Sequence, residues 1–232
     1  MKISTHLAEF VLLAIIAALA GWFRIHDLNT NPPGIFRDEA EKALNGWALA
    51  RTGEAFEFAP GLDGQPSVQW RKHPLFIDVY GVETSSMYQW ALSLIAHQDH
   101  PPTPLQMRLP AAIAGTLSVI ALFLFARILG GAPVALMAAF FLAISPWSIL
   151  FSRWALQGSF IPLLITAGVG GIISAKRCHY AWLLLSAIGF ALAFYTYSGA
   201  RPFVLAFVVV ASALHWRMAL DRSSRLWAVG AI

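Results

Sequence analysis

Long apolar runs recur along most of the chain, and one polar stretch, residues 24 to 107, interrupts them. The first run covers Leu7 to Phe23. Five more follow the polar stretch: Leu109–Ala126, Ala132–Phe151, Ser159–Ala175, Tyr180–Tyr197 and Phe203–Trp216. Each run is close to the roughly 20 residues that a helix needs to cross about 30 Å of hydrocarbon. The pattern therefore predicts an all-α membrane protein, a multi-span helical bundle with at least six transmembrane helices. A seventh begins near Leu226 and is cut short by the chain end.

The first run has two interpretations. Ala18, Leu19 and Ala20 resemble a signal-peptide cleavage site. However, the apolar run continues past them to Phe23, and more spans follow. We therefore expect an uncleaved first span.

The polar stretch 24–107 is predicted to be a folded, external loop. It holds most of the acidic residues and several Pro and Gly turns. Two amphipathic helices are expected within it, over residues 39–51 and from about Ser85 to His97. For the first, Asp38 is the candidate N-cap and Gly53 the terminator. Both helices are too short or too polar to span comfortably, so we expect them to lie flat at the bilayer surface.

Composition supports a membrane location. Hydrophobic residues make up 58% of the 232 residues, and charged residues only 12%. A soluble domain carries roughly 25% charged residues, so much of this surface must face lipid. The basic residues occur singly or in pairs between apolar runs, which argues against nucleic-acid binding. The single cysteine, Cys178, fits neither a disulfide nor a Cys/His metal site, and we interpret it as a passive small residue.

The short loops indicate an orientation. If the N-terminus is cytoplasmic, six basic residues fall inside: Arg127, Lys176, Arg177, Arg217, Arg222 and Arg225. Only Arg153 and Arg201 then fall outside, on the side of the long loop. This bias fits the positive-inside rule. The two exceptions become candidates for function.

The long loop carries two groups that could do chemistry. Asp38 and Glu39 form an acidic pair at the start of the first loop helix, where a carboxylate could act as a general base or hold a divalent metal. A plain N-cap role for Asp38 is equally compatible with the local sequence. Lys72 and His73 follow Arg71 and could bind a lipid phosphate. Alternatively, this basic segment rests against anionic headgroups.

Three arginines flank predicted spans. Arg153 and Arg201 could bind phosphate in a bidentate manner. Each could instead be an interfacial anchor whose side chain reaches out of the membrane. For Arg108, in Arg108-Leu109-Pro110, we favour the anchor interpretation.

The order of these motifs resembles a known family. The Pro-Pro-Gly turn precedes Asp38-Glu39, and Lys72-His73-Pro74-Leu75 and Arg108-Leu109-Pro110 follow. Leu142-Ala143-Ile144-Ser145-Pro146-Trp147, Phe151-Ser152-Arg153 and Tyr195-Thr196-Tyr197 come next, before Ala200-Arg201. This series resembles the N-terminal half of GT-C glycosyltransferases of the protein O-mannosyltransferase type, which are related to the aminoarabinose transferases.

The resemblance implies a membrane glycosyltransferase, a hexosyl- or pentosyltransferase that inverts the anomeric carbon. Its donor would be a sugar on a polyprenyl phosphate, and its acceptor an unidentified protein, lipid or glycan. Asp38, with Glu39 beside it, would act as the base. Lys72 or His73 would contact donor phosphate, and some members use a divalent metal. The implied location is a bacterial inner or plasma membrane, with the first loop external.

Some features depart from the family pattern. Only Pro74 precedes Leu75, where the family has two prolines, and Gln157-Gly158 replaces a frequent acidic residue after the Ser-Arg motif. Family members have more spans, so the chain is expected to be a fragment, which by itself could be inactive.

A multi-span transporter and a non-catalytic membrane scaffold are the alternatives. A transporter predicts charged or helix-breaking residues in mid-span, and these spans have almost none.

Overall fold

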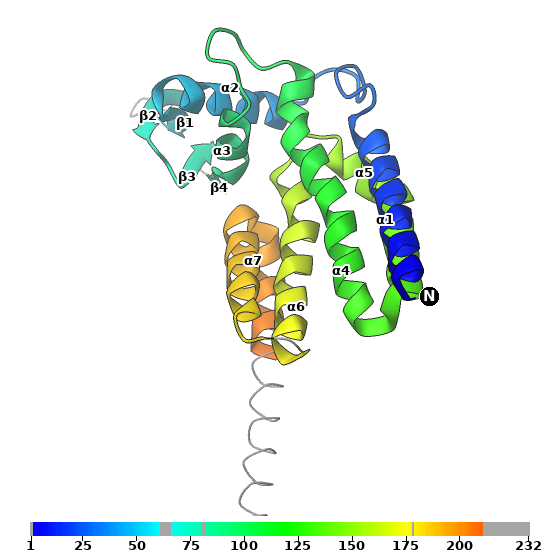
Figure 1. The fold of residues 1–232 in the computed structure, drawn as a ribbon. Helices are drawn as coiled ribbons and strands as arrows, with labels where there is room; N and C mark the ends of the chain where they lie inside the picture. Colours follow the sequence, from blue (N-terminus) through cyan, green and yellow to red (C-terminus); the bar gives the residue numbers. More distant parts are fainter. Residues whose placement is uncertain (1, 61–65, 80–81, 178, 211–232) are drawn as a thin grey trace, which may run out of the picture.

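A helical bundle with a smaller α/β lobe across one end forms the molecule (Figure 1). The structure is a computed structural model that describes residues 2–60, 66–79, 82–177 and 179–210. The chain is mostly helical, as the apolar runs predict. The predicted seventh span near Leu226, the end of the run Phe203–Trp216 and Cys178 lie outside the described residues.

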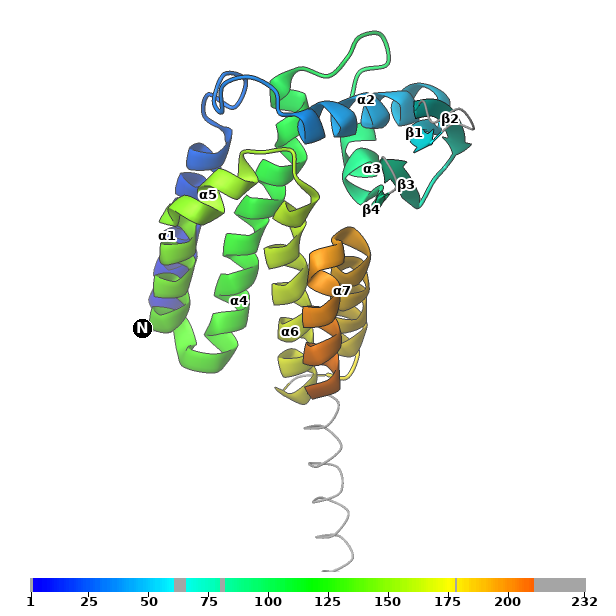
Figure 2. The ribbon, with the colours of Figure 1, turned by 180° about the vertical axis from the view of Figure 1, so that it is seen from behind.

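Four long helices build the bundle: α1 (Lys2–Ile25), α4 (Pro104–Ile144), α6 (Ile161–Arg177) and α7 (Trp182–Thr196). Shorter elements sit beside them: α5 (Pro146–Ser152), η1 (Gln157–Phe160) and η2 (Ser198–Ala200), which leads into helical residues 201–210. The chain runs back and forth between the two ends of the bundle. As a result, α5, η1 and η2 lie at the end that carries the lobe (Figure 2).

Helix α4 is a helical hairpin. It contains Gly131, whose φ of 77° and ψ of −175° are not helical, and Pro133 follows closely. Glycine adopts such a positive φ without a steric penalty. The chain reverses at this point, so the two legs lie side by side (Figure 2). These legs correspond to the predicted runs Leu109–Ala126 and Ala132–Phe151.

The second of those runs is not one continuous helix, and in this detail the prediction was wrong. Ser145 is extended, with φ −60° and ψ 119°, and its side chain caps α5 by accepting the Ser148 N–H. Pro146 occupies the first turn of α5, where a missing N–H costs nothing. A residue before proline avoids the helical region, so the helix ends at Ile144 and restarts.

Three helical segments are long and apolar enough to cross a membrane: His6–Ile25, Pro104–Ile144 and Gln157–Ala175. Two shorter apolar helices, Trp182–Thr196 and Ser198–Val210, complete the set among the described residues. At least six spans remains a prediction.

The α/β lobe consists of α2 (Arg37–Thr52), strands β1 (Glu54–Pro60), β2 (Pro66–Lys72), β3 (Phe76–Val79) and β4 (Val82–Ser85), and α3 (Met87–Ser93). Helix α2 agrees closely with the predicted helix 39–51. It ends at Gly53, which is left-handed with φ 70°. Its N-cap, however, is Phe36 and not Asp38. The Glu39 carboxylate accepts the N–H of Phe36 at 3.2 Å, which satisfies one of the free donors of the first turn.

The sheet was not predicted, so the loop is not purely helical. Its strand order is β2-β1-β3-β4, with β1 antiparallel to β2 and parallel to β3. Its strands are four to seven residues long, and they lack a clear apolar alternation. Ala55 and the polar Glu57 are buried in β1, whereas Val68 and Trp70 of β2 are exposed. Leu49, Ala55 and Ile77 form the core between this sheet and α2, and Trp90 of α3 packs against them. The second predicted helix, from about Ser85 to His97, is shorter in the structure, where α3 covers Met87–Ser93.

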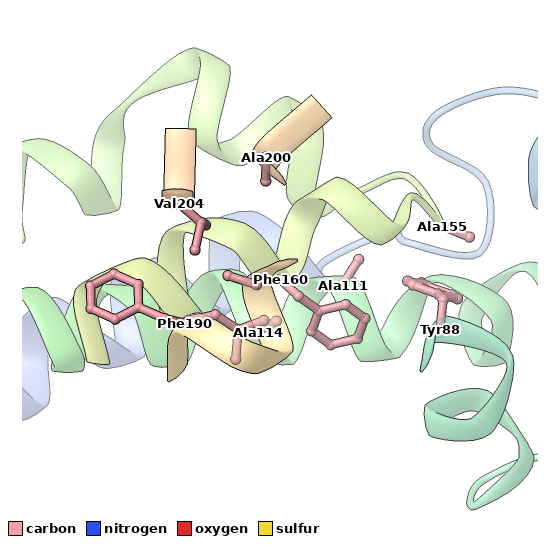
Figure 3. Packing of buried hydrophobic residues seen from close by; sticks show 10 residues of the cluster. Tyr88, Ala111, Ala114, Ala155, Phe160, Phe190, Ala200 and Val204 are labelled. Atoms are coloured by element: carbon pink, nitrogen blue, oxygen red, sulfur yellow. The ribbon is translucent and has the colours of Figure 1, made fainter. Parts of the chain in front are cut away.

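A buried cluster joins the lobe to the bundle (Figure 3). Tyr88 of α3 packs near Phe160 of η1, with ring centroids 5.5 Å apart, and its hydroxyl donates to the Met107 carbonyl at 2.8 Å. Phe190 of α7 and Val204 extend the cluster into the bundle. The lobe is therefore packed against the helices and positions α2 over their end.

Candidate active site

A cavity of about 740 Å³ lies where α2 meets the bundle. Its polar lining includes two α2 side chains, Asp38 and Lys42, together with the four serines Ser118, Ser148, Ser152 and Ser159. Its apolar wall includes Leu142, Trp147, Phe151, Ile161 and Phe203. Small-molecule sites are typically apolar clefts of about 300–1,000 Å³ with a few convergent polar groups, and this cavity has that character.

Beside the cavity, Glu39 forms a buried ion pair with Arg108. The pair is bidentate, with Nε to Oε1 and Nη2 to Oε2 both at 2.9 Å, and both side chains are almost completely buried. Glu39 Oε1 also accepts the Ala155 N–H at 2.9 Å. Burial raises the pKa of Glu39, but the hydrogen bonds from Arg108, Ala155 and Phe36 outweigh that effect, and its pKa lies below the usual value. Glu39 is thus a charged acceptor whose two oxygens are already bound.

The same arginine organises the connection before α2. Arg108 Nη1 donates to the carbonyls of Leu28 and Pro32, and Nη2 donates to the Gly34 carbonyl at 2.7 Å. It therefore fixes the Pro-Pro-Gly turn as well as Glu39. The anchor interpretation of Arg108 understated its role, since the side chain is buried and joins three separate segments.

Asp38 shares the first turn of α2 with Glu39 but differs from it in exposure and surroundings. It is exposed, lies in the first turn of α2 and lines the cavity. Because Phe36 is the N-cap, the simple capping role for Asp38 is excluded. The structure thus separates the acidic pair into a buried structural carboxylate, Glu39, and an exposed residue at the cavity, Asp38.

Arg24 lies behind the cavity wall and is fully buried. Its guanidinium donates to the carbonyls of Ala20, Leu142 and Ala143 and to the Ser148 hydroxyl at 2.8 Å. Its Nε has no hydrogen-bond partner. Among the described residues, no carboxylate pairs with this charge.

Gly115 lets this guanidinium approach the cavity. A β-carbon at Gly115 would lie 3.0 Å from Nε of Arg24 and 2.5 Å from Cβ of Ser152. Gly115, Ser148 and Ser152 all line the cavity. An uncompensated buried cation favours a nearby anion, because the charge interaction is strong at low dielectric.

Arg153 is committed to backbone carbonyls. Its Nη1 donates to Phe23 at 2.8 Å and its Nη2 to Asn31 at 2.7 Å. It lines a separate cavity of about 280 Å³ together with His26 and Asp27. The structure therefore places Arg153 as a link between α5 and the end of α1, outside the larger cavity.

Arg201 follows η2, next to two residues of the larger cavity, Gly199 and Ala200. Its guanidinium lies 5.7 Å from the centroid of the Phe194 ring, and its Nε donates to the Phe194 carbonyl at 3.4 Å. It is near the cavity but does not line it.

Lys72 is the last residue of β2 and His73 follows it, and neither lines the cavity. Lys72 is exposed and its Nζ is 3.9 Å from Glu54. The His73 ring stacks on Trp90 with centroids 5.8 Å apart, and the backbone N–H of His73 donates to the Gly53 carbonyl. The structure does not bring these two residues together with Asp38.

The described residues do not form an obvious metal site. No group of three or more His, Cys, Asp or Glu side chains comes together within them. Asp38 is the one carboxylate that lines the cavity in this part of the chain, and the oxygens of Glu39 are bound to Arg108. A divalent ion prefers several oxygen ligands, so a metal at this cavity would need ligands in addition to Asp38.

Lys42 and Arg24 were missed as candidates from the sequence. Lys42 had a clear signal in the sequence, whereas that of Arg24 was ambiguous. Lys42 follows Asp38 by four residues, which places the two on one helix face. Arg24 is a charge at the end of an apolar run, a position that sequence alone assigns equally well to an interfacial anchor.

A family model described as dolichyl-phosphate-mannose-protein mannosyltransferase matches residues 83–232. The matched region begins in β4 and extends to the C-terminal end, and it covers more than half of the chain. The segment with Asp38 and Lys42 precedes it. Searches of characterised proteins and of solved structures gave no significant match.

Proposed function

Because the chain belongs to the dolichyl-phosphate-mannose-protein mannosyltransferase family, a family of GT-C membrane glycosyltransferases, we propose that it transfers a sugar from a polyprenyl-phosphate donor. The acceptor is a hydroxyl group on the external or periplasmic side of the membrane. The reaction is a single displacement that inverts the anomeric carbon.

The observation that carries this proposal is the position of Asp38. Asp38 is an exposed residue that lines a cavity of about 740 Å³ at the end of the bundle. A general base must lie within hydrogen-bond reach of the proton that it removes. An acceptor hydroxyl that enters this cavity can meet that condition.

The reaction requires one bond to form and one to break. The acceptor oxygen attacks the anomeric carbon while its proton passes to Asp38. The bond between that carbon and the donor phosphate oxygen breaks, and its electron pair leaves with the phosphate. Phosphate is a good leaving group, so the protein must mainly stabilise the negative charge that develops on it.

Glu39 acts in this proposal as a positioning residue. Its ion pair with Arg108 and its bond to the Ala155 N–H connect α2, α4 and the segment after α5. These contacts fix the first turn of α2, and so the place of Asp38, relative to the cavity. Rigid support of this kind keeps a catalytic group in its reactive geometry.

The cavity walls suit the two parts of such a donor. The unpaired charge of Arg24 behind Ser148 and Ser152 favours an anion on the polar side. On the apolar side, Trp147, Phe151 and Phe203 are more than half exposed. A prenyl chain that enters from the membrane would cover such surface, which is favourable in proportion to the apolar area buried.

The test is sugar transfer from radiolabelled polyprenyl-phosphate sugars in membranes that contain the full-length protein, either wild type or Asp38→Asn. We expect the substitution to lower turnover by about 100-fold or more, because the loss of a general base typically costs that much. The control is Asp99→Asn. Asp99 is an exposed acidic residue of the same polar stretch that does not line the described cavities.

Undiminished transfer by folded Asp38→Asn would remove Asp38 as the base. Absence of transfer from any donor by the folded wild type would contradict the glycosyltransferase proposal and favour a transporter or scaffold.

A further inference from the structure

Lys42 lies one helical turn after Asp38 and lines the same cavity. Its side chain is only 8% exposed. The ammonium group donates to the Asp38 carbonyl at 3.2 Å and lies 3.5 Å from Oε2 of Glu41. A nearly buried ammonium group loses much of its hydration, and this loss is unfavourable unless other groups bind the charge. We therefore considered which groups could bind Lys42 at the cavity.

Among the described residues, Lys42 is the one cationic side chain that lines the cavity. The candidates from sequence have partners elsewhere. Arg153 donates to two carbonyls, Arg201 lies over Phe194, and Lys72 is in the sheet. Arg24 contributes charge but is shielded from direct contact because it is fully buried.

The local contacts leave Lys42 capable of binding a ligand. An ammonium group has three N–H donors, and the contacts above account for two directions. Glu41 does not belong to Lys42 alone, because its other oxygen, Oε1, accepts from Asn45 at 2.8 Å and from Gln89 at 3.3 Å. One N–H therefore remains for an anion in the cavity.

We propose that Lys42 binds the phosphate group of the polyprenyl-phosphate donor and stabilises it as it leaves. This assignment rests on the function proposed above, and it replaces Lys72 and His73 in that role. Lys42 is then a substrate-binding residue that acts beside Asp38.

An in-line displacement places the acceptor oxygen about 3 Å from its base, with the anomeric carbon between that oxygen and the leaving phosphate. Asp38 and Lys42 line the same cavity. A sugar bound there can therefore have the carboxylate on its acceptor side and the ammonium group on its phosphate side.

The experiment measures ligand binding separately from turnover. Full-length protein in lipid nanodiscs is titrated with polyprenyl phosphate and, in parallel, with the uncharged polyprenol, and quenching of tryptophan fluorescence reports occupancy. The variants are Lys42→Met, Lys42→Arg and Lys72→Met. Arg51→Met is the matched control, since Arg51 is an exposed cation of the same helix that stacks on Trp47.

We expect Lys42→Met to weaken binding of polyprenyl phosphate by about tenfold or more, the usual effect of losing a charge-assisted hydrogen bond. Polyprenol binding should not change. Lys42→Arg should recover part of the affinity, and Arg51→Met should match wild type with both ligands.

Three outcomes would overturn the proposal. The first is unchanged phosphate affinity in Lys42→Met, and the second is an equal loss for both ligands, which would indicate a structural role. The third is loss of phosphate affinity in Lys72→Met and not in Lys42→Met. Sugar transfer is measured on the same samples. Phosphate-selective binding through Lys42 without transfer by wild type would support this site and contradict the proposed reaction.

Discussion

Asp38 and Glu39 show how two adjacent carboxylates acquire different roles. Glu39 points into the protein and meets Arg108 and the Ala155 N–H, whereas Asp38 is exposed to the cavity. Consecutive residues of a helix point about 100° apart, since 3.6 residues complete one turn. One of the two can therefore hold the structure while the other remains free to react.

Removal of the Glu39 charge should destabilise the fold. We expect Glu39→Gln to cost about 3–5 kcal/mol, because Arg108 would remain buried without a counterion. Thermal unfolding of the purified protein in detergent, followed by tryptophan fluorescence, measures the effect.

Glu54→Gln provides the comparison. Its partner Lys72 is 3.9 Å away and largely exposed, and such surface pairs contribute at most about 1 kcal/mol. Similar unfolding temperatures for the two variants would show that the buried pair does not stabilise the protein.

At the scale of elements, small residues set how closely α6 and α7 pack. A β-carbon at Gly171 would lie 2.6 Å from the Ser186 nitrogen and 2.7 Å from the Trp182 carbonyl oxygen. A β-carbon at Gly189 would lie 2.7 Å from the Gly168 nitrogen. Contacts between apolar helices depend on such close approach, because hydrophobic burial drives them little within lipid.

Two adjacent glycines should therefore respond differently to alanine. Gly171→Ala forces the backbones of α6 and α7 apart, and overpacking of this kind costs about 1–3 kcal/mol. Gly170→Ala meets only Phe125, at 3.8 Å, and should be neutral or stabilising by up to about 1 kcal/mol, since alanine favours helix more than glycine does. Thermal unfolding of both variants tests the difference. Equal destabilisation by the two substitutions would show that the close packing of Gly171 against α7 does not govern the effect.

At the scale of the molecule, the chain reverses direction with each long helix. The α/β lobe, α5, η1 and η2 gather at one end of the bundle, and the turn of α4 lies at the other (Figures 1 and 2). An ion pair between Glu9 of α1 and Arg127 of α4 joins the two helices. This arrangement agrees with the alternation that the apolar runs predicted, and it places the cavity at the end with the polar stretch.

The proposed orientation predicts which positions are accessible from outside. In a Cys178→Ser background, Asp99→Cys should react with a membrane-impermeant maleimide on intact cells. Leu129→Cys, next to the turn of α4 and 55% exposed, should react only after permeabilisation, because it lies at the other end of the bundle. The reverse pattern would show that the N-terminus is external and would place the candidate active site in the cytoplasm.

The sequence by itself determined the features that neighbouring residues encode. Apolar runs of membrane length predicted the long helices, and the Asp38 region with Gly53 predicted α2. The sequence also holds a local signal for the break at Ser145 and Pro146. The prediction missed it because the apolar run continues on both sides of this pair.

Only the tertiary structure decided which residues of the acidic and basic motifs meet. Glu39 and Arg108 are 69 positions apart, and Arg24 meets Ser148 across 124. Such pairings depend on how helices and strands pack, which periodicity does not encode. The short strands of the lobe were missed for a related reason, since each is stabilised by partners in other strands and by Leu49 of α2. The packing thus placed Asp38 and Lys42 at one cavity and left Lys72 and His73 at the end of β2, away from it.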